Sequence, residues 1–354
     1  MKLIPILLIS ILAIGSGLYF SHSTQTVKPM HISIVEKYNK WRSQYRKLYA
    51  SPSEMNFRMT IFAEKLKMVE DANAHYEEQV RLNNDTPLTG PMFSLKSFSD
   101  LTTVEFKKKF TGIDLSKAKN TDIDEVDLSK PAKPLGASES SGLGQTAFKI
   151  RVRNQGECGS CWAFSTVATI ERKYFDQTKT QLDLSQQELV DCSTEDSGCD
   201  GGWPFNTYSY VKNYGISTGT AYPYYGNQGY CEREGIKRVT FDQSFGPKQH
   251  DFALPILSRV INAGIIPGIC VYSSGQFSHI SSSDDVYNAR YGNECSQTVD
   301  HAVNLSGAGA DFAVVLNSWG TDWGNQGLKK IRPCTASNLL GTPSLISHTS
   351  RHFA

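Results

Sequence analysis

Residues 154–165 read NQGECGSCWAFS, and the interpretation of the whole chain depends on this stretch. Its two cysteines, Cys158 and Cys161, lie three positions apart beside glycines. From Ser160 onward, apolar residues recur at helical spacing and predict a helix, at Phe164, Val167, Ile170 and Tyr174. A thiol at a helix N-terminus lies at the positive end of the helix dipole, which favours the thiolate. The pattern therefore suggests that Cys161 is a nucleophile.

Other functions of the two cysteines need features that the sequence lacks. A zinc site would need a second ligand pair at similar spacing, and none follows. A thioredoxin-like redox pair would follow a strand in a βαβ unit, whereas this pair follows an extended RVRNQG and opens a helix. A thiol–disulfide exchanger that uses Cys158 and Cys161 remains an alternative to the nucleophile.

A nucleophilic cysteine needs a histidine to take its proton and a polar group to hold that histidine. His301 lies in VDHAV and Asn317 in LNSWG, 16 residues later. Both stretches, and IIPGICVY before them, predict strands, and an antiparallel pair could bring the two side chains together. His279 is the second candidate base, but no amide follows it at matching spacing.

The start of the chain and its charge bear on location and partners. Residues 1–20, MKLIPILLISILAIGSGLYF, have the layout of a secretory signal peptide, with a membrane anchor as the alternative. No later segment approaches membrane length, so we expect the mature chain to have no stable membrane span and to form disulfides on the secretory route. With 36 basic and 35 acidic residues among 354, nothing favours a nucleic-acid partner.

The order of predicted elements indicates two units. Residues 31–49 predict an amphipathic helix, with Ile34 and Leu48 at its ends, and a second helix should start after Ser51-Pro52-Ser53. Such a pair buries little surface alone and needs a partner to dock on. Residues 112–146 then read as an exposed polar linker. Beyond it, helical patterns precede strand patterns, which predicts an α+β fold.

Five motifs in this order resemble those of papain-family cysteine proteases, and the chain is most similar to the cathepsin L-like branch. They are NQGECGSCWAFS, LSQQELVDC, GCDGGWP, VDHAV and NSWGTDWG. The resemblance implies a papain-like fold of two subdomains, a helical left half and a β-barrel-like right half, with an N-terminal helical propeptide. It implies a signal peptide at 1–20, an inhibitory propeptide and activation linker at 21–138, and a peptidase domain at 139–354. The chain would then be a monomeric cysteine endopeptidase proenzyme, secreted or lysosomal, acting on proteins and peptides.

The resemblance also assigns roles in catalysis. Cys161 would be the nucleophile and His301 the general base and acid, forming a thiolate–imidazolium pair. Asn317 would orient the imidazole, and Trp319 would keep water away from it. The side chain of Gln155, with the backbone N–H of Cys161, would form the oxyanion hole. No metal and no organic cofactor is implied.

Substrate contacts and disulfides follow from the same resemblance. Glycines would pair with an extended peptide, and apolar residues would wall the pocket for the second residue before the cut, which predicts a preference for aliphatic or aromatic side chains there. These residues are Gly201, Gly202, Trp203, Pro204, Val299 and Leu339. The expected disulfides are Cys158–Cys199, Cys192–Cys231 and Cys295–Cys334, leaving Cys161 and Cys270 free.

The chain departs from the family pattern at several positions. Lys65 stands where the propeptide pattern has asparagine, Leu316 stands where a lysine precedes the asparagine of the active site, and Gly142-Leu143-Gly144 replaces an Asp-Trp-Arg stretch. These departures favour one alternative function, a catalytically silent binding protein of the same fold. The intact Cys161 and His301 argue against it.

Overall fold

The computed structural model describes residues 32–117, 148–241, 247–251, 261, 266–292, 295, 297–334 and 345–349. Of the two strands at 247–251 and 345–349, only the backbone is described. The expected signal peptide, most of the linker, residues 142–144 and Leu339 lie outside the described residues. Among the described residues, no helix combines the length and apolar character needed to cross a bilayer.

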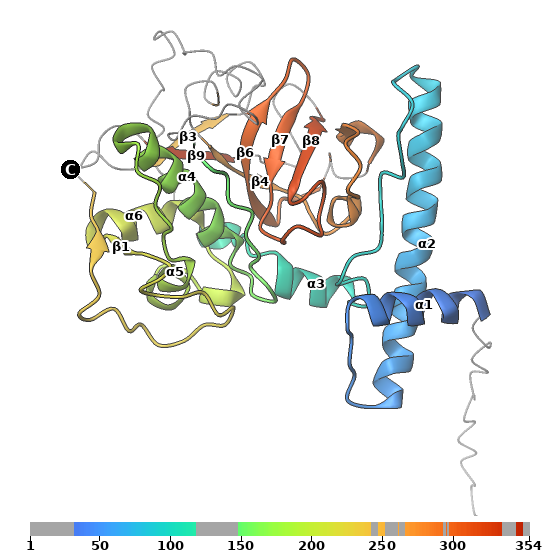
Figure 1. Cartoon of the computed structure of the whole chain (residues 1–354), viewed down its shortest axis with the longest axis horizontal. Coiled ribbons are helices and arrows are strands. Elements are labelled where there is room, and N and C mark those ends of the chain that lie inside the picture. Colours follow the sequence, from blue (N-terminus) through green and yellow to red (C-terminus); the bar gives the residue numbers. More distant parts are fainter. Residues whose placement is uncertain are drawn as a thin grey trace, which may run out of the picture.

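A helical half and a sheet half lie side by side, and the N-terminal helices pack against the far side of the sheet half (Figure 1). The helical half holds α4 (Cys161–Thr178), α5 (Gln186–Cys192), η2 (Gly198–Asp200) and α6 (Pro204–Tyr214). Its short strands β1 (Ile216–Ser217) and β2 (Arg238–Val239) pair antiparallel. The sequence-based prediction of an α+β fold with a helical half followed by a β half is confirmed.

Helix α4 forms where the sequence predicts it and forms the centre of the helical half. Val167 and Ile170 are fully buried, and they pack with Leu189 of α5 and Tyr208 of α6. The helix ends at Lys179, whose positive φ of 58° places it in the left-handed region that commonly terminates helices. This packing fixes the N-terminus of α4, and with it Cys161, at the border between the halves.

The sheet half is built on seven described strands. In spatial order they are β3 (Pro247–Asp251), β9 (Leu345–Thr349), β4 (Gly268–Val271), β6 (His301–Ala308), β7 (Ala313–Leu316), β8 (Leu328–Arg332) and β5 (Tyr287–Asn288). All neighbours are antiparallel except β5 and β8. Short 3-10 turns, η3 (Gln276–His279) and η4 (Ala289–Tyr291), connect β4, β5 and β6.

The N-terminal region contains α1 (Ile32–Gln44), which crosses α2 (Pro52–Leu82). Tyr38, Trp41 and Phe62 form the crossing, with the Phe62 ring 5.3 Å from Tyr38 and 5.1 Å from Trp41. The predicted helix over 31–49 is wrong at its C-terminal end, because Arg46 adopts a positive φ of 51° beyond Gln44. Leu48 is consequently 93% exposed and does not face the core.

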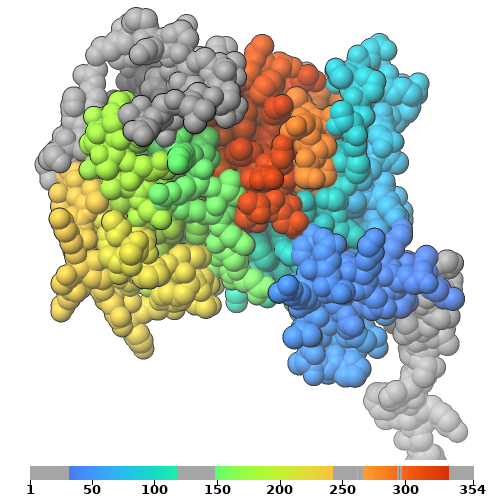
Figure 2. Space-filling view, in the orientation of Figure 1, coloured from blue at the N-terminus to red at the C-terminus, as the bar shows by residue number. Residues whose placement is uncertain are grey.

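Helix α2 docks on the sheet half through one shared core. Val69 and Tyr76 of α2 belong to the same buried cluster as Tyr287 and Val303 of the sheet, and Tyr76 stacks 5.8 Å from Tyr287. In space-filling form, the N-terminal helices make one continuous body with the sheet half (Figure 2). The helical pair thus has the docking partner that its limited core requires.

After α2, the chain returns toward the border between the halves. Residues 92–101 run along the surface of the sheet half, where backbone hydrogen bonds join Met92 to Ser281 and Ser94 to His279. Helix α3 (Thr103–Phe110) then starts with a capping box formed by Thr102 and Glu105. Phe98 lies among Phe106, Phe110 and Trp319, with ring centroids 4.9 to 5.8 Å away. Residues beyond α3, ending in η1 (Leu115–Lys117), then reach the turn before α4, where Gly112 lies against Gly159.

Candidate active site

The predicted nucleophile begins α4. Cys161 is the first helical residue, Ser160 is the N-cap, and the disulfide from Cys158 to Cys199 frames the turn before them. The thiol of Cys161 is fully buried, and its Sγ accepts a hydrogen bond from the backbone N–H of Ala302 at 3.3 Å. Because Ala302 directly follows His301, this hydrogen bond brings the start of β6 against the thiol of Cys161 across the border between the halves.

The predicted base is held by Asn317 and Trp319, two residues in the segment that follows β7. Nε2 of His301 donates to Oδ1 of Asn317 at 2.8 Å, because a carboxamide oxygen can only accept. The imidazole stacks on Trp319, with centroids 4.5 Å apart and planes 24° from parallel. Nδ1 then carries the free lone pair, and this buried atom has no hydrogen-bond partner among the described residues. The ring is therefore oriented for its Nδ1 to accept a proton.

Burial determines the protonation of both groups in this closed form. It raises the pKa of the Cys161 thiol to about 12, against the lowering effect of the Ala302 N–H. It lowers the pKa of His301 to about 4, against the raising effect of its bond to Asn317. Burial therefore opposes both charges of the expected thiolate–imidazolium pair while the site is covered, and entry of water would favour the pair.

Gln155 lies in the turn before Cys161 and is fully buried. Its Oε1 accepts from Ser318 Oγ at 2.7 Å, and its Nε2 donates to the carbonyl of Cys158 at 2.9 Å. The same Nε2 donates to the carbonyl oxygen of Phe110 at 3.2 Å, which also accepts from Trp319 Nε1 at 2.9 Å. The carbonyl of Phe110, in the N-terminal region, thus accepts a hydrogen bond from the Gln155 amide that we expect to bind the oxyanion.

Residues 110–114, which we call the cleft strand, cover the rest of the site with backbone contacts. The N–H groups of Gly112 and Ile113 both donate to the carbonyl of Asp300 at 3.1 Å. On the other side, Gly202 donates to Gly112 at 2.9 Å and accepts from Asp114 at 3.2 Å. The predicted peptide-pairing glycine thus pairs with the N-terminal region itself, and the cleft strand blocks access to Cys161.

A buried apolar cluster adjoins the cleft strand. Trp203 and Val299, two of the predicted wall residues, form a buried cluster with Phe205 and Cys270. Ile113 and Leu115 of the N-terminal region pack against it. Pro204 is the first residue of α6, and Gly201 adopts a positive φ of 119° beside the Gly112 carbonyl. The sequence did not identify Phe205 or Cys270, because their place in the wall depends on tertiary packing.

The disulfides join Cys158 to Cys199, Cys192 to Cys231 and Cys295 to Cys334, the pairs that the resemblance implied. Cys161 and Cys270 are free. Since Cys158 is bonded to Cys199, it is not available as an exchange partner for Cys161, and the thiol–disulfide exchanger loses its second thiol. Among the described residues, no group of three or more potential metal-binding side chains gathers at one place.

His279, the second candidate base, lies elsewhere. It is buried beneath Phe98, with Ser278 Oγ 2.8 Å from its Nδ1 and Ser99 Oγ 3.3 Å from its Nε2. Burial, reinforced by the positive charges of Lys65 and Lys96, lowers the pKa of His279 to about 3. It therefore belongs to the contact between the N-terminal region and the sheet half and not to the catalytic group.

Comparison with known proteins agrees with this geometry. Residues 145–341 match the papain family cysteine protease domain, and residues 38–106 match the cathepsin propeptide inhibitor domain. The chain is 30% identical to a cathepsin L-like proteinase of Fasciola hepatica, covering 88% of this chain and 91% of the relative. It is 29% identical to papain of Carica papaya, covering 86% and 83%. The solved digestive procathepsin L2 of Tenebrio molitor superposes with a TM-score of 0.65 at 25% identity, covering 90% and 100%.

Proposed function

The chain belongs to the papain family of cysteine proteases, and we propose here which of its residues carry out peptide cleavage and where it acts. It is a cysteine endopeptidase made with its own inhibitory propeptide. We propose that Cys161 is the nucleophile, His301 the proton carrier, Asn317 the group that orients it, and Gln155 an oxyanion donor. One observation carries this assignment: Sγ of Cys161 lies 3.3 Å from the backbone nitrogen of Ala302, the residue directly after His301.

The proposed reaction follows from these positions. After the cleft strand leaves, water enters and removes the burial that opposes both charges, so the thiol proton can pass to Nδ1 of His301. Sγ of Cys161 attacks the scissile carbonyl carbon, and the amides of Gln155 and Cys161 hold the developing oxyanion. His301 gives its proton to the leaving nitrogen as the C–N bond breaks. Water, deprotonated by the same ring, then cleaves the thioester and restores the thiol.

A labelling experiment tests the assignment. The acid-activated, reduced protein is treated with a peptidyl epoxide, and the modified residue is mapped by mass spectrometry. We expect the label on Cys161 with loss of peptidase activity, and Cys161→Ala should abolish both. No label and no cleavage would instead support the silent binding protein. Cleavage that survives in Cys161→Ala would refute the assignment.

We also propose the substrate preference given by the buried apolar cluster. Trp203 and Val299, with Phe205 and Cys270, offer the second residue before the cut a wall without charge, and two aliphatic residues already pack there. Leu339 would form the base of the pocket. Aliphatic and aromatic side chains should therefore be preferred at this position. A peptide-library profile dominated by arginine would contradict the proposal.

We further propose that the protein follows the secretory route to the lysosome or the cell exterior, and that it acts as a monomer without a nucleic-acid partner. Three disulfides and the apolar leader at 1–20 support the route. The formal charge of +1 supports the absence of nucleic acid. The domain limits at 20 and 138 are likewise a proposal, consistent with domain matches at 38–106 and 145–341.

A further inference from the structure

The hydroxyl of Tyr224 lies between the two ends of the turn that precedes the nucleophile. It is 2.7 Å from the carbonyl oxygen of Gln155 and 2.8 Å from Oγ of Ser160. Gln155 opens this turn, and Ser160 is the residue directly before Cys161. One side chain from a distant loop therefore contacts both ends of the segment that carries the proposed oxyanion donors.

The direction of these two hydrogen bonds is fixed by chemistry. A carbonyl oxygen can only accept, so the Tyr224 hydroxyl donates its proton to Gln155. The Tyr224 oxygen must then accept from Ser160, whose other acceptor, the carbonyl of Cys158, is farther away at 3.4 Å. Burial raises the pKa of Tyr224 to about 12, so the phenol keeps its proton at any pH where the enzyme works. Two hydrogen bonds thus run in series, from Ser160 to Tyr224 and from Tyr224 to the carbonyl of Gln155.

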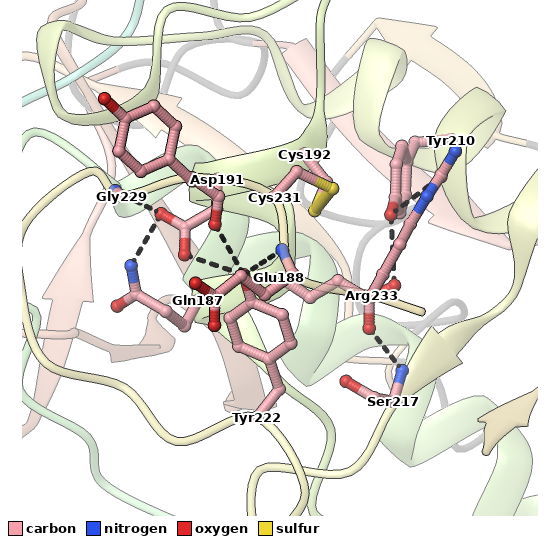
Figure 3. Close-up of a disulfide and its surroundings, with 12 residues drawn as sticks. Gln187, Glu188, Asp191, Cys192, Tyr210, Ser217, Tyr222, Gly229, Cys231 and Arg233 are labelled. Carbon is pink, nitrogen blue, oxygen red and sulfur yellow. Dashed lines mark hydrogen bonds between the residues drawn. A yellow bond between two sulfur atoms is a disulfide. The ribbon is translucent and has the colours of Figure 1, made fainter. Parts of the chain in front are cut away.

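The Tyr224 ring is itself held in place. It meets Phe164 of α4 edge to face, with centroids 4.9 Å apart. Its loop is anchored on α5, since Asp191 accepts from the hydroxyl of Tyr222 at 3.0 Å and from the N–H of Gly229 at 2.7 Å (Figure 3). The disulfide from Cys192, the next residue of α5, closes the same loop at Cys231.

We propose that Tyr224 is a positioning residue for catalysis, which fixes the spacing between the Gln155 amide and the N–H of Cys161. This inference rests on the function proposed for Gln155 and Cys161. Donors stabilise an oxyanion best when they are already in position, because they then need no reorganisation during the reaction. The hydrogen bonds and the ring contact of Tyr224 go to Gln155, Ser160 and Phe164, in the turn before the nucleophile and on α4, so its effect should fall on turnover and not on substrate binding.

The test is the loss of one hydroxyl. Tyr224→Phe keeps the ring on Phe164 but removes both hydrogen bonds, and we expect kcat to fall about three- to tenfold. KM should stay unchanged. The matched control is Tyr225→Phe, on the same loop, whose hydroxyl bonds Asp191 at 2.9 Å and whose side chain is 54% exposed. Both activated variants are titrated with a peptidyl epoxide, so that kcat refers to functional sites, and the control should match the parent enzyme.

A second variant tests the coupling. Ser160→Ala removes the hydroxyl that donates to Tyr224. The fold-decrease in kcat of the double variant with Tyr224→Phe should be smaller than the product of the two single decreases, because both side chains act through one hydrogen-bond network. Multiplicative losses, an unchanged kcat in Tyr224→Phe, or a loss confined to KM would each overturn the inference. These outcomes are distinct from failure of the proposed function, in which the parent enzyme itself would show no Cys161-dependent cleavage.

Discussion

Where α2 and Phe98 lie against the sheet half, the propeptide adds buried aromatic side chains to backbone hydrogen bonds such as that from Ser94 to His279, whereas the cleft strand is held mainly by backbone hydrogen bonds. At the first region, which we call the docking face, Phe98 covers His279 and packs on Trp319. At the second, four backbone hydrogen bonds join residues 112–114 to Asp300 and Gly202. The docking face thus depends on aromatic volume and on an uncharged histidine. The cleft strand depends on close backbone approach, to which side-chain charge contributes little.

Breaking the docking face should have the largest effect. Phe98→Ala removes a ring that is 5% exposed and makes four ring contacts, to Phe106, Phe110, His279 and Trp319. Its loss should destabilise the docked propeptide by about 3–5 kcal/mol. We expect Cys161 to react with a peptidyl epoxide much faster at neutral pH, followed by mass spectrometry of the intact proenzyme. Phe57→Ala, on an α2 residue that is 52% exposed, is the control. An unchanged labelling rate in Phe98→Ala would show that docking does not depend on this ring.

Disturbing the cleft strand should come second. A Cβ on Gly112 would collide with the carbonyl of Gly159, and such overpacking typically costs about 1–3 kcal/mol. Gly112→Ala should therefore increase the same labelling rate, by less than Phe98→Ala does. Gly90→Ala is the matched control, because nothing lies within 4 Å of its added Cβ. A larger effect at Gly112 than at Phe98 would reverse the ranking of the two regions.

Acid should weaken the docking face and leave the cleft strand little changed. His279 has a pKa of about 3 when docked and should regain its ordinary value near 6.5 when Phe98 and Ser99 leave. The docked form then binds fewer protons, so docking weakens as the pH falls below about 6.5, by up to about 1.4 kcal/mol per pH unit. No such loss from this group is expected above that pH.

The groups around His279 reinforce this direction. Lys65 of α2 and Lys96 both lower its pKa, and Lys96 Nζ donates to the carbonyl of Asp322. His279→Gln should flatten the acid response, measured as the ratio of variant to parent labelling rates between pH 4 and 7. The ratio cancels the intrinsic pH dependence of the thiol. A ratio that does not change with pH would contradict the role of His279.

The smallest effect is expected on the exposed side of α2. Lys67 and Asp71 form an ion pair at 2.6 Å, but their side chains are 75% and 63% exposed. Lys67→Ala should change the unfolding free energy by less than about 0.5 kcal/mol. Thermal unfolding of the proenzyme measures this, with the parent as reference. A large destabilisation would mean that propeptide stability is not concentrated in the docking face.

The sequence predicts well what local pattern and chain order determine. Helical spacing located α4, and β-rich runs bounded by turn residues located the two strands near whose ends His301 and Asn317 come together. The predicted C-terminal end of the first helix was wrong, because the positive φ of Arg46 leaves no signal in the hydrophobic periodicity. The buried position of His279 and the carbonyl of Phe110 on Gln155 depend on contacts between residues far apart in sequence. No local pattern encodes such contacts.

Tyr224 illustrates the same limit within the site. Its sequence neighbours, Tyr222 and Tyr225, are also tyrosines, and nothing in composition distinguishes the one that faces the turn before Cys161. Only the fold, with α5 and the disulfide at Cys231 holding the loop, aims one hydroxyl at Gln155 and the other two at Asp191. A sequence signal for positioning residues of this kind would require knowledge of which side chains share a space.

Each of the three disulfides joins two residues of the same half: two lie in the helical half and one in the sheet half. The catalytic couple is therefore assembled across a seam that no disulfide crosses, held by contacts such as those from Asn304 to Ser165 and Thr169. On gradual heating, we expect the two halves to separate while each keeps its own disulfides. Inactivation of the mature enzyme would then precede the loss of its secondary structure, and cooling would restore it by simple re-docking.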